Sequence, residues 1–234
     1  YKDRATKTLL FTTEKESIKA VQLLGGNPAV MEQMAKSELL KEFDIIDINM
    51  GCPVPNVFKS GEGSALMLDW KRTAAIIRGC KKSGKTITVK CRTGISEDNM
   101  FAAEFARVCE EAGADMITIH GRSRSMMYDG EPYLDEIEKA KAAVSIPVIA
   151  NGGIYSVEMA KRVMEYTGAD GIMLARYGLE NPFVFSELTG KPCKKTAFQI
   201  LSEQIELTAQ HYDETFTLSY IKKIASYMMK KRRG

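Results

Sequence analysis

A cysteine, whose thiol could take part in chemistry, stands directly after a short apolar run. Residues 45–49 have the composition of a buried parallel strand, and Gly51-Cys52-Pro53 then interrupts the run. Cys52 is therefore expected at the end of a core strand. The following loop contains Gly61 and Gly63, which would let a bulky ligand approach the backbone. A cysteine in such a turn can also be only a small buried hydrophobic residue.

Other polar side chains also end apolar runs. Lys90 closes residues 86–90, where a cation could face an electron-rich ligand or simply lie at the surface. His120 is followed by glycine, which favours ligand contact, although a lone histidine there could also satisfy a backbone carbonyl. His211 falls on a polar helical stretch and is predicted to be a surface residue. The set at or just after the ends of apolar runs is Gln22, Asn49, Cys52, Lys90, His120, Asn151 and Arg176.

Two turns could hold a phosphate group. Residues 149–153 end in Asn151-Gly152-Gly153, which leaves backbone N–H groups free at the start of a helix. Residues 173–176 add the guanidinium of Arg176 beside the next helix N-terminus. Each turn alone is weak evidence, but at adjacent strand ends the two would suit a monophosphate such as that of FMN.

Short β-rich runs alternate with amphipathic helical stretches along the chain, which predicts parallel strands joined by crossover helices. Two short sequences, residues 112–115 and 167–170, each place a glycine just before a strand and indicate an internal repeat of one βα unit. The predicted strands are residues 20–24, 45–49, 86–90, 116–120, 147–150 and 171–174. The predicted helices are residues 28–42, 70–82, 99–111, 134–143 and 157–166.

Six such strands could form an open doubly wound sheet or part of an eight-stranded barrel. No Gly-x-Gly-x-x-Gly follows the first strand, which removes the main support for a dinucleotide-binding sheet. Polar residues instead collect at the C-terminal ends of many different strands, where a TIM barrel carries its active site. We therefore expect an α/β fold built on an incomplete TIM (β/α)8 barrel.

The overall composition is that of an ordinary globular chain. The 234 residues are 44% hydrophobic and 27% charged, with no apolar run long enough to cross a bilayer and no signal-peptide pattern at the start. Five cysteines without a C-x-x-C pair argue against a disulfide framework and against a structural metal site. We expect a cytoplasmic, monomeric protein without membrane or metal partners.

The C-terminal part is basic, although the net charge of the chain is only +3. No acidic residue occurs from Thr215 to Gly234, so this segment could neutralise the phosphates of a nucleic acid. A solvated helix face is the simpler alternative. The six positive charges are Lys222, Lys223, Lys230, Lys231, Arg232 and Arg233.

The sequence around Cys52 resembles the signature loop of the tRNA-dihydrouridine synthases, flavin enzymes that reduce uridine in tRNA. The resemblance rests on Asn49-Met50-Gly51-Cys52-Pro53, on Val57 and on a Gly-x-Gly-x-x-Leu-Met sequence that ends at Met67. It implies FMN-dependent reduction of specific uridines in tRNA to 5,6-dihydrouridine, with NADPH or NADH as the electron source. Hydride would pass from the reduced flavin to C6 of the uracil, and Cys52 would give a proton to C5.

The same resemblance implies roles for further residues. Asn49 would contact the uracil edge and Arg122 and Arg124 the RNA backbone, while the loop from Val54 to Gly63 would move to close over the base. The family often has Asp where Gly153 stands and Gly where Ala175 stands. The residues implied to contact the flavin are Gln22, Lys90, His120, Asn151, Gly152, Gly153, Ala175 and Arg176.

The resemblance also predicts how the chain is divided. It runs from Val21 to Pro182, and the six strands would correspond to strands 3–8 of the family's barrel, without its first two. Residues 1–190 would form the partial flavin-binding barrel, and residues 197–234 the beginning of a small α-helical tRNA-binding domain. Lys222-Lys223-Ile224 stands where Arg-Lys-His is common in the family.

Three alternatives remain open at the level of sequence. Another FMN barrel, such as the dihydroorotate dehydrogenases, could act on a free pyrimidine, but the basic C-terminal segment would then have no role. A barrel aldolase without flavin could use Lys90 to form a Schiff base. An RNA-binding relative that has lost catalysis is the third.

Overall fold

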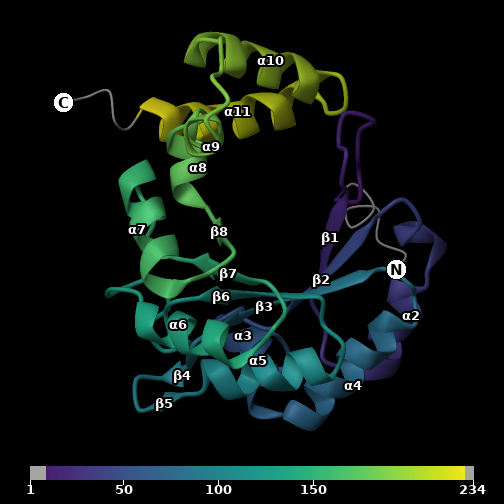
Figure 1. Ribbon diagram of the computed structural model, residues 1–234. Helices are drawn as coiled ribbons and strands as arrows, with labels where there is room; N and C mark the ends of the chain where they lie inside the picture. Colours follow the sequence, from purple (N-terminus) through teal and green to yellow (C-terminus); the bar gives the residue numbers. More distant parts are fainter. Residues whose placement is uncertain (1–8, 230–234) are drawn as a thin grey trace. The chain divides into compact units, whose positions relative to one another are not determined.

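The computed structural model describes residues 9–229, and its first compact unit is built on a six-stranded sheet (Figure 1). Every neighbouring pair of strands in this sheet is parallel, and the spatial order is β1-β2-β3-β6-β7-β8. The strands are β1 (Ala20–Leu23), β2 (Ile45–Asn49), β3 (Thr86–Arg92), β6 (Met116–His120), β7 (Val148–Asn151) and β8 (Gly171–Met173).

Helices connect successive strands, as the alternating pattern predicts. Two of them begin with strong signals: the Asn27 side chain caps α2, which has Pro28 at its first position, and the Asp69 side chain accepts the Arg72 N–H of α4. In Figure 1, α4, α5 and α6 lie along one face of the sheet, and each contacts a strand. The helices are α2 (Pro28–Ala35), α4 (Trp70–Lys81), α5 (Ala102–Glu111), α6 (Leu134–Ala143) and α7 (Val157–Thr167).

The two faces of the sheet differ in chemistry because side chains alternate along each strand. The strand register places one set of alternate residues under the helices, and its members are buried aliphatic residues or cysteine: Ile46, Ile48, Ile87, Val89, Cys91, Ile117, Ile119, Val148 and Ala150. The other set is mainly polar: Gln22, Asp47, Asn49, Thr88, Lys90, Arg92, Thr118, His120, Ile149, Asn151 and Met173. The apolar face supplies the core, and the polar face is left for chemistry.

The internal repeat has a structural counterpart at the amino end of the strands. Asp115 stands just before β6, donates its N–H to the carbonyl of Ile87 and accepts the Ile87 N–H on its side chain, at 2.7 Å each. Asp170, just before β8, forms the same two bonds with Val148 at 2.9 and 2.8 Å. Asp44, just before β2, forms them with Lys19 at 2.8 Å each. We call this reciprocal pair of hydrogen bonds the aspartate clamp.

Several elements differ from the sequence-based expectation. The segment from Val54 to Gly63, predicted to be a loop, contains the helix α3 (Pro55–Lys59), and a 3-10 helix (Gly63–Leu68) follows it. The predicted helix at residues 28–42 ends at Ala35, and Ser37 then caps a short 3-10 helix (Glu38–Leu40). Residues 99–100 do not begin a helix, because β5 (Asn99–Met100) pairs with β4 (Gly94–Ser96) in an antiparallel hairpin.

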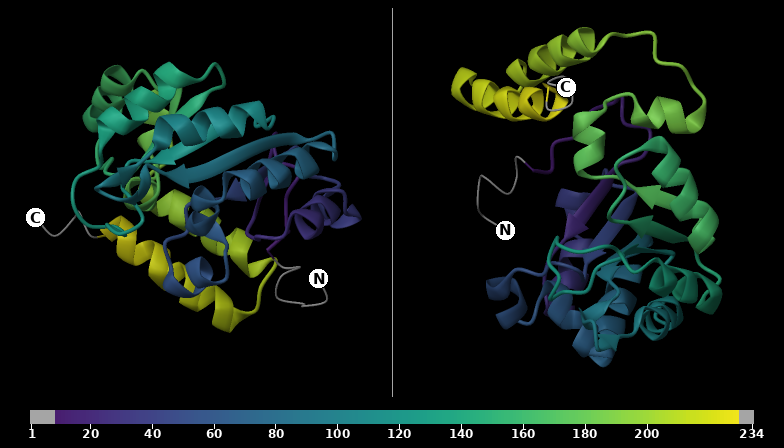
Figure 2. Two further views of the ribbon diagram at one scale, coloured as in Figure 1. Left: turned by 90° about the horizontal axis from the view of Figure 1, so that it is seen from below. Right: turned by 90° about the vertical axis from the view of Figure 1, so that its left-hand side faces the viewer.

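Within the described residues, the second compact unit comprises residues 154–162 and 174–229. Thr196 and Gln199 form a capping box at the start of α10, and α10 and α11 lie side by side in both views of Figure 2. Lys222 and Lys223 are exposed on α11, whereas the other four basic residues of the predicted C-terminal cluster lie outside the described residues. The helices of this unit are α8 (Arg176–Glu180), α9 (Val184–Thr189), α10 (Ala197–Ala209) and α11 (Glu214–Met229).

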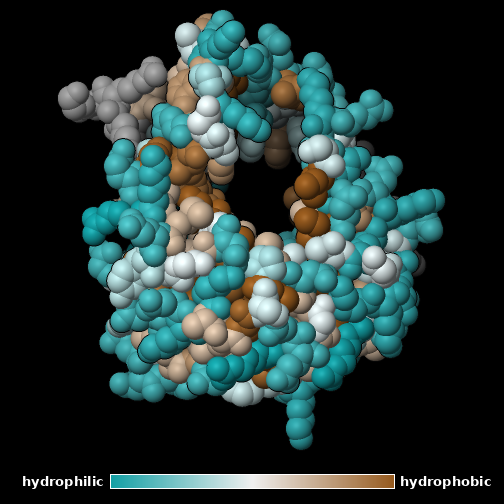
Figure 3. Space-filling model, viewed as in Figure 1, coloured by the Kyte–Doolittle hydropathy of each residue, from teal (hydrophilic) through white to brown (hydrophobic). Residues whose placement is uncertain are grey.

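The fold is therefore the predicted α/β arrangement, with six strands of a TIM-type barrel followed by helices. Within residues 9–229, β1 and β8 each have a strand on one side only. Ile18 and Leu24, which flank β1, are 66% and 47% exposed, and Figure 3 shows hydrophobic surface beside that strand. None of the described helices is both long and apolar enough to cross a membrane. The predicted division at residues 190 and 197 stays a prediction, and residues 190–196 between α9 and α10 contain neither helix nor strand.

Candidate active site at the carboxyl end of the strands

Cys52 follows β2 at the carboxyl edge of the sheet, and its backbone is held from two sides. The Asn49 side-chain oxygen accepts the N–H groups of Gly51 and Cys52 at 3.1 and 3.0 Å. The Cys52 carbonyl accepts the backbone N–H of Ser64 at 3.1 Å and its hydroxyl at 2.7 Å. The side chain is partly exposed, so the thiol can meet a ligand from a fixed backbone position.

Gly63 makes this close packing possible. Its φ of +58° lies in the left-handed region, and a Cβ at this position would stand 2.8 Å from the Cβ of Cys52 and 3.0 Å from a methyl group of Val57. Any side chain at residue 63 would therefore push the segment after α3 away from the cysteine. Gly63, the second glycine of the Gly-x-Gly sequence, is thus required for close packing against Cys52.

Arg92, which sequence reasoning did not single out, ties the Cys52 turn to the segment after β6. Only 3% of Arg92 is exposed, and its Nε donates to the carbonyl of Gly51 at 2.9 Å. Its Nη1 donates to the carbonyls of Ser123 and Met127 at 2.9 and 2.8 Å. Burial lowers the pKa of this guanidinium, as does the nearby Arg122, and the three carbonyls accept three of its five N–H groups.

Lys90 and Asn151 form a second polar group on the same face of the sheet. The Lys90 ammonium donates to the Asn151 side-chain oxygen at 3.0 Å, and the Asn151 amide donates to the Met173 carbonyl at 2.8 Å. Burial lowers the pKa of Lys90 because the interior disfavours its charged form. The register places Thr118 beside Lys90, and the Thr118 hydroxyl has no hydrogen-bond partner within the described part of the chain.

The turn after β7 has the left-handed glycines that its sequence predicts. Gly152 has a φ of +103°, and a Cβ there would stand 2.7 Å from the ring of His120, which is 9% exposed. Gly153 has a φ of +70°, and its Cβ would stand 2.5 Å from Pro132. Both glycines are thus required by backbone conformation and by close neighbours.

The two arginines predicted to meet RNA are engaged within the protein. Arg122 is 5% exposed and donates from Nε to the carbonyls of Asp129 and Gly130 at 3.1 and 2.8 Å. The Arg124 guanidinium lies 3.8 Å from the ring centre of Phe58, a close cation–π contact that links it to α3. Arg122 therefore shapes the segment after β6, and Arg124 retains partial exposure beside the Cys52 segment.

Ala175 and Arg176 belong to the second unit and are described with it. Arg176 donates from Nη2 to the Tyr155 hydroxyl at 3.0 Å, and its guanidinium lies 5.7 Å from the centre of the Tyr155 ring. Residue 175 precedes the first residue of α8 with a φ of −120°. Their predicted contact with a phosphate remains a prediction.

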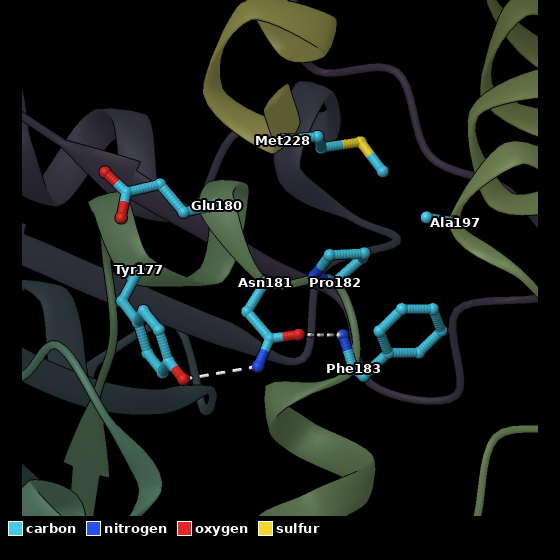
Figure 4. A pocket seen from close by; sticks show the side chains of 7 residues that line it. All are labelled: Tyr177, Glu180, Asn181, Pro182, Phe183, Ala197 and Met228. Atoms are coloured by element: carbon cyan, nitrogen blue, oxygen red, sulfur yellow. Dashed lines mark hydrogen bonds between the residues drawn. The ribbon is translucent and has the colours of Figure 1, made fainter. Parts of the chain in front are cut away.

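The second unit also contains a pocket of about 200 Å³ (Figure 4). Asn181 shapes it by accepting the Phe183 N–H at 3.0 Å and donating to the Tyr177 hydroxyl at 3.2 Å. None of the site residues predicted from sequence lines it. The lining residues are Tyr177, Glu180, Asn181, Pro182, Phe183, Ala197 and Met228.

The remaining cysteines differ from Cys52 in their surroundings. Burial raises the pKa of Cys80 to about 11 and that of Cys91 to about 12, and it raises the pKa of Cys109 well above its usual value. Cys193 is exposed, but it lies in the second unit between α9 and α10. Cys52 is thus the one accessible thiol at the carboxyl edge of the sheet among the described residues.

Comparison with known families agrees with this arrangement. The sequence model described as dihydrouridine synthase matches residues 1–233, which is nearly the whole chain. The chain belongs to the dihydrouridine synthase family.

Curated members of the dihydrouridine synthase family are similar over most of this chain. It is 38% identical over 212 residues to tRNA-dihydrouridine synthase B from Pasteurella multocida, which covers 89% of this chain and 64% of the relative. It is 41% identical over 179 residues to tRNA-dihydrouridine synthase B from Vibrio cholerae, with coverages of 74% and 54%. This dihydrouridine synthase chain thus spans less than two thirds of the length of either relative.

A solved structure supports the fold of this dihydrouridine synthase chain. N-acetylneuraminate lyase from Mycoplasma synoviae superposes with a TM-score of 0.50 at 14% identity, covering 74% of this chain and 58% of the lyase. At such low identity the likeness concerns the fold alone, and it agrees with the predicted partial TIM barrel.

The first unit brings together most of the dihydrouridine synthase residues predicted from sequence. Gln22, Asn49, Lys90, His120 and Asn151 share the polar face of the sheet. Sequence reasoning missed Arg92 and Asp47, which lie on that face too. Alternation along β2 and β3 could have found them, because each stands two residues from a predicted site residue.

Proposed function

We propose that the protein containing this chain reduces specific uridines in tRNA to 5,6-dihydrouridine with an FMN cofactor and NADPH or NADH as reductant. The observation that carries the proposal is Cys52, a partly exposed thiol with a fixed backbone, on the sheet edge that also bears Lys90 and the Gly152–Gly153 turn. The family match and the relatives named tRNA-dihydrouridine synthase B support the substrate class.

The residues on the polar face fit a flavin mononucleotide. The left-handed backbone at Gly152 and Gly153 can turn N–H groups toward a phosphate, and the Thr118 hydroxyl, which has no hydrogen-bond partner within residues 9–229, offers a hydrogen bond inside the site. Lys90 and Gln22 supply donors for the carbonyl oxygens and nitrogens of a flavin ring. When bound and reduced, FMN supplies the hydride that goes to C6 of the uracil.

Cys52 provides the proton for C5 of the uracil. Negative charge develops on the uracil carbonyl and C5 as hydride arrives at C6, and the thiol proton neutralises it while the sulfur becomes a thiolate. Arg92 stands behind the Cys52 turn through the Gly51 carbonyl, and its charge interacts with Cys52.

Basic side chains that retain exposure are the candidates for recognition of tRNA. Lys222 and Lys223 are exposed on α11 and can neutralise phosphates, which would make binding depend on salt concentration. Arg124, beside the Cys52 segment, is the remaining first-unit candidate for a contact with RNA. The target base has to leave its stack to reach the thiol.

The test uses the full-length protein and begins with the visible spectrum of the purified protein and of its heat-released ligand. The wild type is expected to release FMN and to form dihydrouridine in uridine-containing tRNA when NADPH is supplied, as measured by mass spectrometry of the digested tRNA. Cys52→Ala is expected to keep the flavin, while its turnover falls about 10²–10⁴-fold, the usual contribution of a general acid.

The matched control is Cys193→Ala, which removes the exposed thiol of the second unit. It should retain wild-type turnover. Wild-type turnover in Cys52→Ala would refute the acid assignment, and a colourless protein that takes up no FMN would refute the flavin reaction altogether.

The lowered pKa of Lys90 favours one second candidate, a Schiff base to a carbonyl substrate, because a neutral lysine is nucleophilic. Borohydride trapping in the presence of carbonyl compounds would reveal it as a mass increase on the peptide containing Lys90. We expect no such adduct, since Lys90 is hydrogen-bonded to Asn151.

A further inference from the structure

A chain of side-chain hydrogen bonds runs along the polar face from Asp47 to the backbone of Cys52. The Gln22 amide donates from Nε2 to Asp47 Oδ2 at 2.7 Å. The Asn49 amide donates from Nδ2 to Gln22 Oε1 at 2.8 Å, and Asn49 Oδ1 accepts the N–H groups of Gly51 and Cys52. We call this series the Asp47 relay.

The direction of every hydrogen bond in the Asp47 relay is determined by its two ends. The orientation of a side-chain amide is normally ambiguous, because its nitrogen and oxygen have similar shapes. Here the backbone N–H groups at one end can only donate, so Asn49 must present its oxygen to them. The Asp47 carboxylate at the other end can only accept, so Gln22 must present its nitrogen. The two requirements agree, which gives the relay a single arrangement.

Asp47 is itself held in place. Its second oxygen, Oδ1, accepts the hydroxyl of Thr88 at 2.6 Å, and Thr88 is 2% exposed on the neighbouring strand β3. A carboxylate with one oxygen fixed by a buried hydroxyl presents the other in a defined direction. Because hydrogen bonds to an ionised group are stronger than neutral ones, Asp47 dominates the choice of orientation.

We propose that Asp47 is a positioning residue that, through Gln22 and Asn49, fixes the backbone of Cys52 and sets both amides as hydrogen-bond donors toward a ligand. Each amide has two N–H bonds and uses one of them within the relay. The second N–H of each has no protein partner among residues 9–229, so it can serve an acceptor atom such as a carbonyl oxygen or a ring nitrogen. The relay therefore selects ligands with acceptors at these two places.

The inference rests on the proposed function only for the chemical task of Cys52. In the apo protein, removal of the acceptor at residue 47 should by itself loosen the turn at Gly51 and Cys52. Amide hydrogen exchange measures that loosening without flavin or tRNA. A failure of the flavin reaction and a failure of the relay would thus be seen in different experiments.

The first variant is Asp47→Asn in the full-length apo protein. The substitution removes the charged acceptor that gives the relay a single direction, so Gln22 can also turn its oxygen toward residue 47. In that reversed arrangement Asn49 faces two donors. Exchange of the Gly51 and Cys52 amides, followed by mass spectrometry of the peptide covering residues 49–54, is expected to rise about tenfold, as for a hydrogen bond worth about 1.4 kcal/mol. Unchanged exchange would overturn the proposal.

The decisive variant is the double exchange Asp47→Asn with Gln22→Glu. A carboxylate at residue 22 accepts from both neighbouring amides, so Asn49 regains its orientation while the net charge stays the same as in the wild type. Exchange at Gly51 and Cys52 should return to within about threefold of the wild type. If the double variant exchanges as fast as the single one, Asp47 acts through general stability and the relay is refuted.

Asp44→Asn is the matched control. Asp44 lies only three residues before Asp47, but it forms the aspartate clamp at the opposite end of β2. It should leave exchange at residues 51 and 52 unchanged. If Asp47→Asn does not fold, Gln22→Leu replaces it, since Gln22 is exposed and its loss removes the middle of the relay. That variant is expected to show the same tenfold rise, and wild-type exchange would refute the relay.

A second readout comes from the holoenzyme. A residue that only supports the fold would lower the melting temperature and change activity through the amount of folded protein. Asp47→Asn is expected to lower kcat at a given amount of folded, flavin-loaded enzyme, while the double variant recovers the part of kcat that depends on the Cys52 turn. Equal kcat per folded enzyme in wild type and Asp47→Asn would contradict the proposed role.

Discussion

At the amino edge of the sheet the same arrangement occurs three times, whereas at the carboxyl edge no two strands end in the same way. The aspartate clamp joins the starts of β1 and β2, of β3 and β6, and of β7 and β8. The carboxyl edge carries a cysteine turn, a buried lysine, a histidine and a glycine turn, one after another. Repetition fits a common structural task, and variety fits a site in which each group meets a different part of a ligand.

This contrast between the edges predicts that substitutions at the carboxyl edge change chemistry more than stability. Cys52→Ser keeps a hydroxyl in place of the thiol, but a hydroxyl is a much weaker acid. We expect turnover to fall by about 10²–10⁴ with a melting temperature close to that of the wild type. Dihydrouridine formation in tRNA and thermal unfolding monitored by circular dichroism measure the two effects. A large loss of stability would contradict the proposed difference between the two edges.

The glycine turn combines both kinds of effect. Gly152→Ala places a Cβ 2.7 Å from the His120 ring at a φ of +103°, so it should cost about 1–3 kcal/mol of stability and weaken flavin binding. Gly84→Ala is the matched control, because Gly84 has a φ of +76° with no atom within 4 Å of its Cβ. It should show the smaller backbone cost alone and normal flavin content. Equal losses in both variants would remove the special role of the His120 contact.

Substitutions at the amino edge should instead lower stability and leave turnover per folded molecule unchanged. Asp115→Ala removes the clamp acceptor for the Ile87 N–H and the partner of Lys81, whose ammonium lies 2.8 Å away. The expected loss is about 1.5 kcal/mol of unfolding free energy, with turnover per folded molecule unchanged. Glu111→Ala, which removes a nearby exposed carboxylate, should leave stability within about 0.5 kcal/mol of the wild type. A turnover defect in Asp115→Ala would show that the two edges are coupled.

The smallest effect concerns acid pH. The bond from Lys141, together with the Val148 N–H, lowers the pKa of Asp170 below its usual 3.8. A lowered carboxyl pKa in the folded state contributes stability above pH 3.8, and this contribution is lost as the pH falls through the folded-state value. The stability difference between wild type and Asp170→Asn should therefore be full at pH 7 and shrink below pH 3.8. A difference that stays constant to pH 2 would mean that the clamp does not lower the pKa of Asp170.

The sequence predicted the strands of the sheet well because their apolar runs are sharply bounded. Residues 45–49 and helix residues 134–143 have the bounds that the structure shows. β3 extends two residues beyond the predicted end at Lys90. Arg92 looks like a surface residue in sequence, but it is buried beside Cys91 and donates to backbone carbonyls. The strand extension explains why Arg92 was missed.

Other elements carry too little local signal to be predicted. β4 and β5 have three and two residues, too short for any periodicity, and they exist because they pair with each other. The helix α3 looks polar and glycine-bounded in sequence, and its placement depends on contacts such as Arg124 with Phe58. Among the site residues, strand ends could be predicted, whereas the hydrogen bonds that fix them, such as Gln22 with Asp47 and Arg92 with Gly51, join residues 25 and 41 positions apart.

The aspartate clamp also has a consequence for alignment of the strands. Side chains in a strand alternate with a period of two, so a slip of one residue exchanges the two faces of the sheet. Such a slip in β3 would turn Lys90 toward the helices and bring Val89 and Cys91 to the polar face. The clamp ties the start of one strand to the aspartate just before its neighbour through two bonds at once. It therefore penalises that slip at the end of the sheet farthest from Cys52. The repeated carboxylates thus help to maintain the strand register that holds the site residues on one face of the sheet.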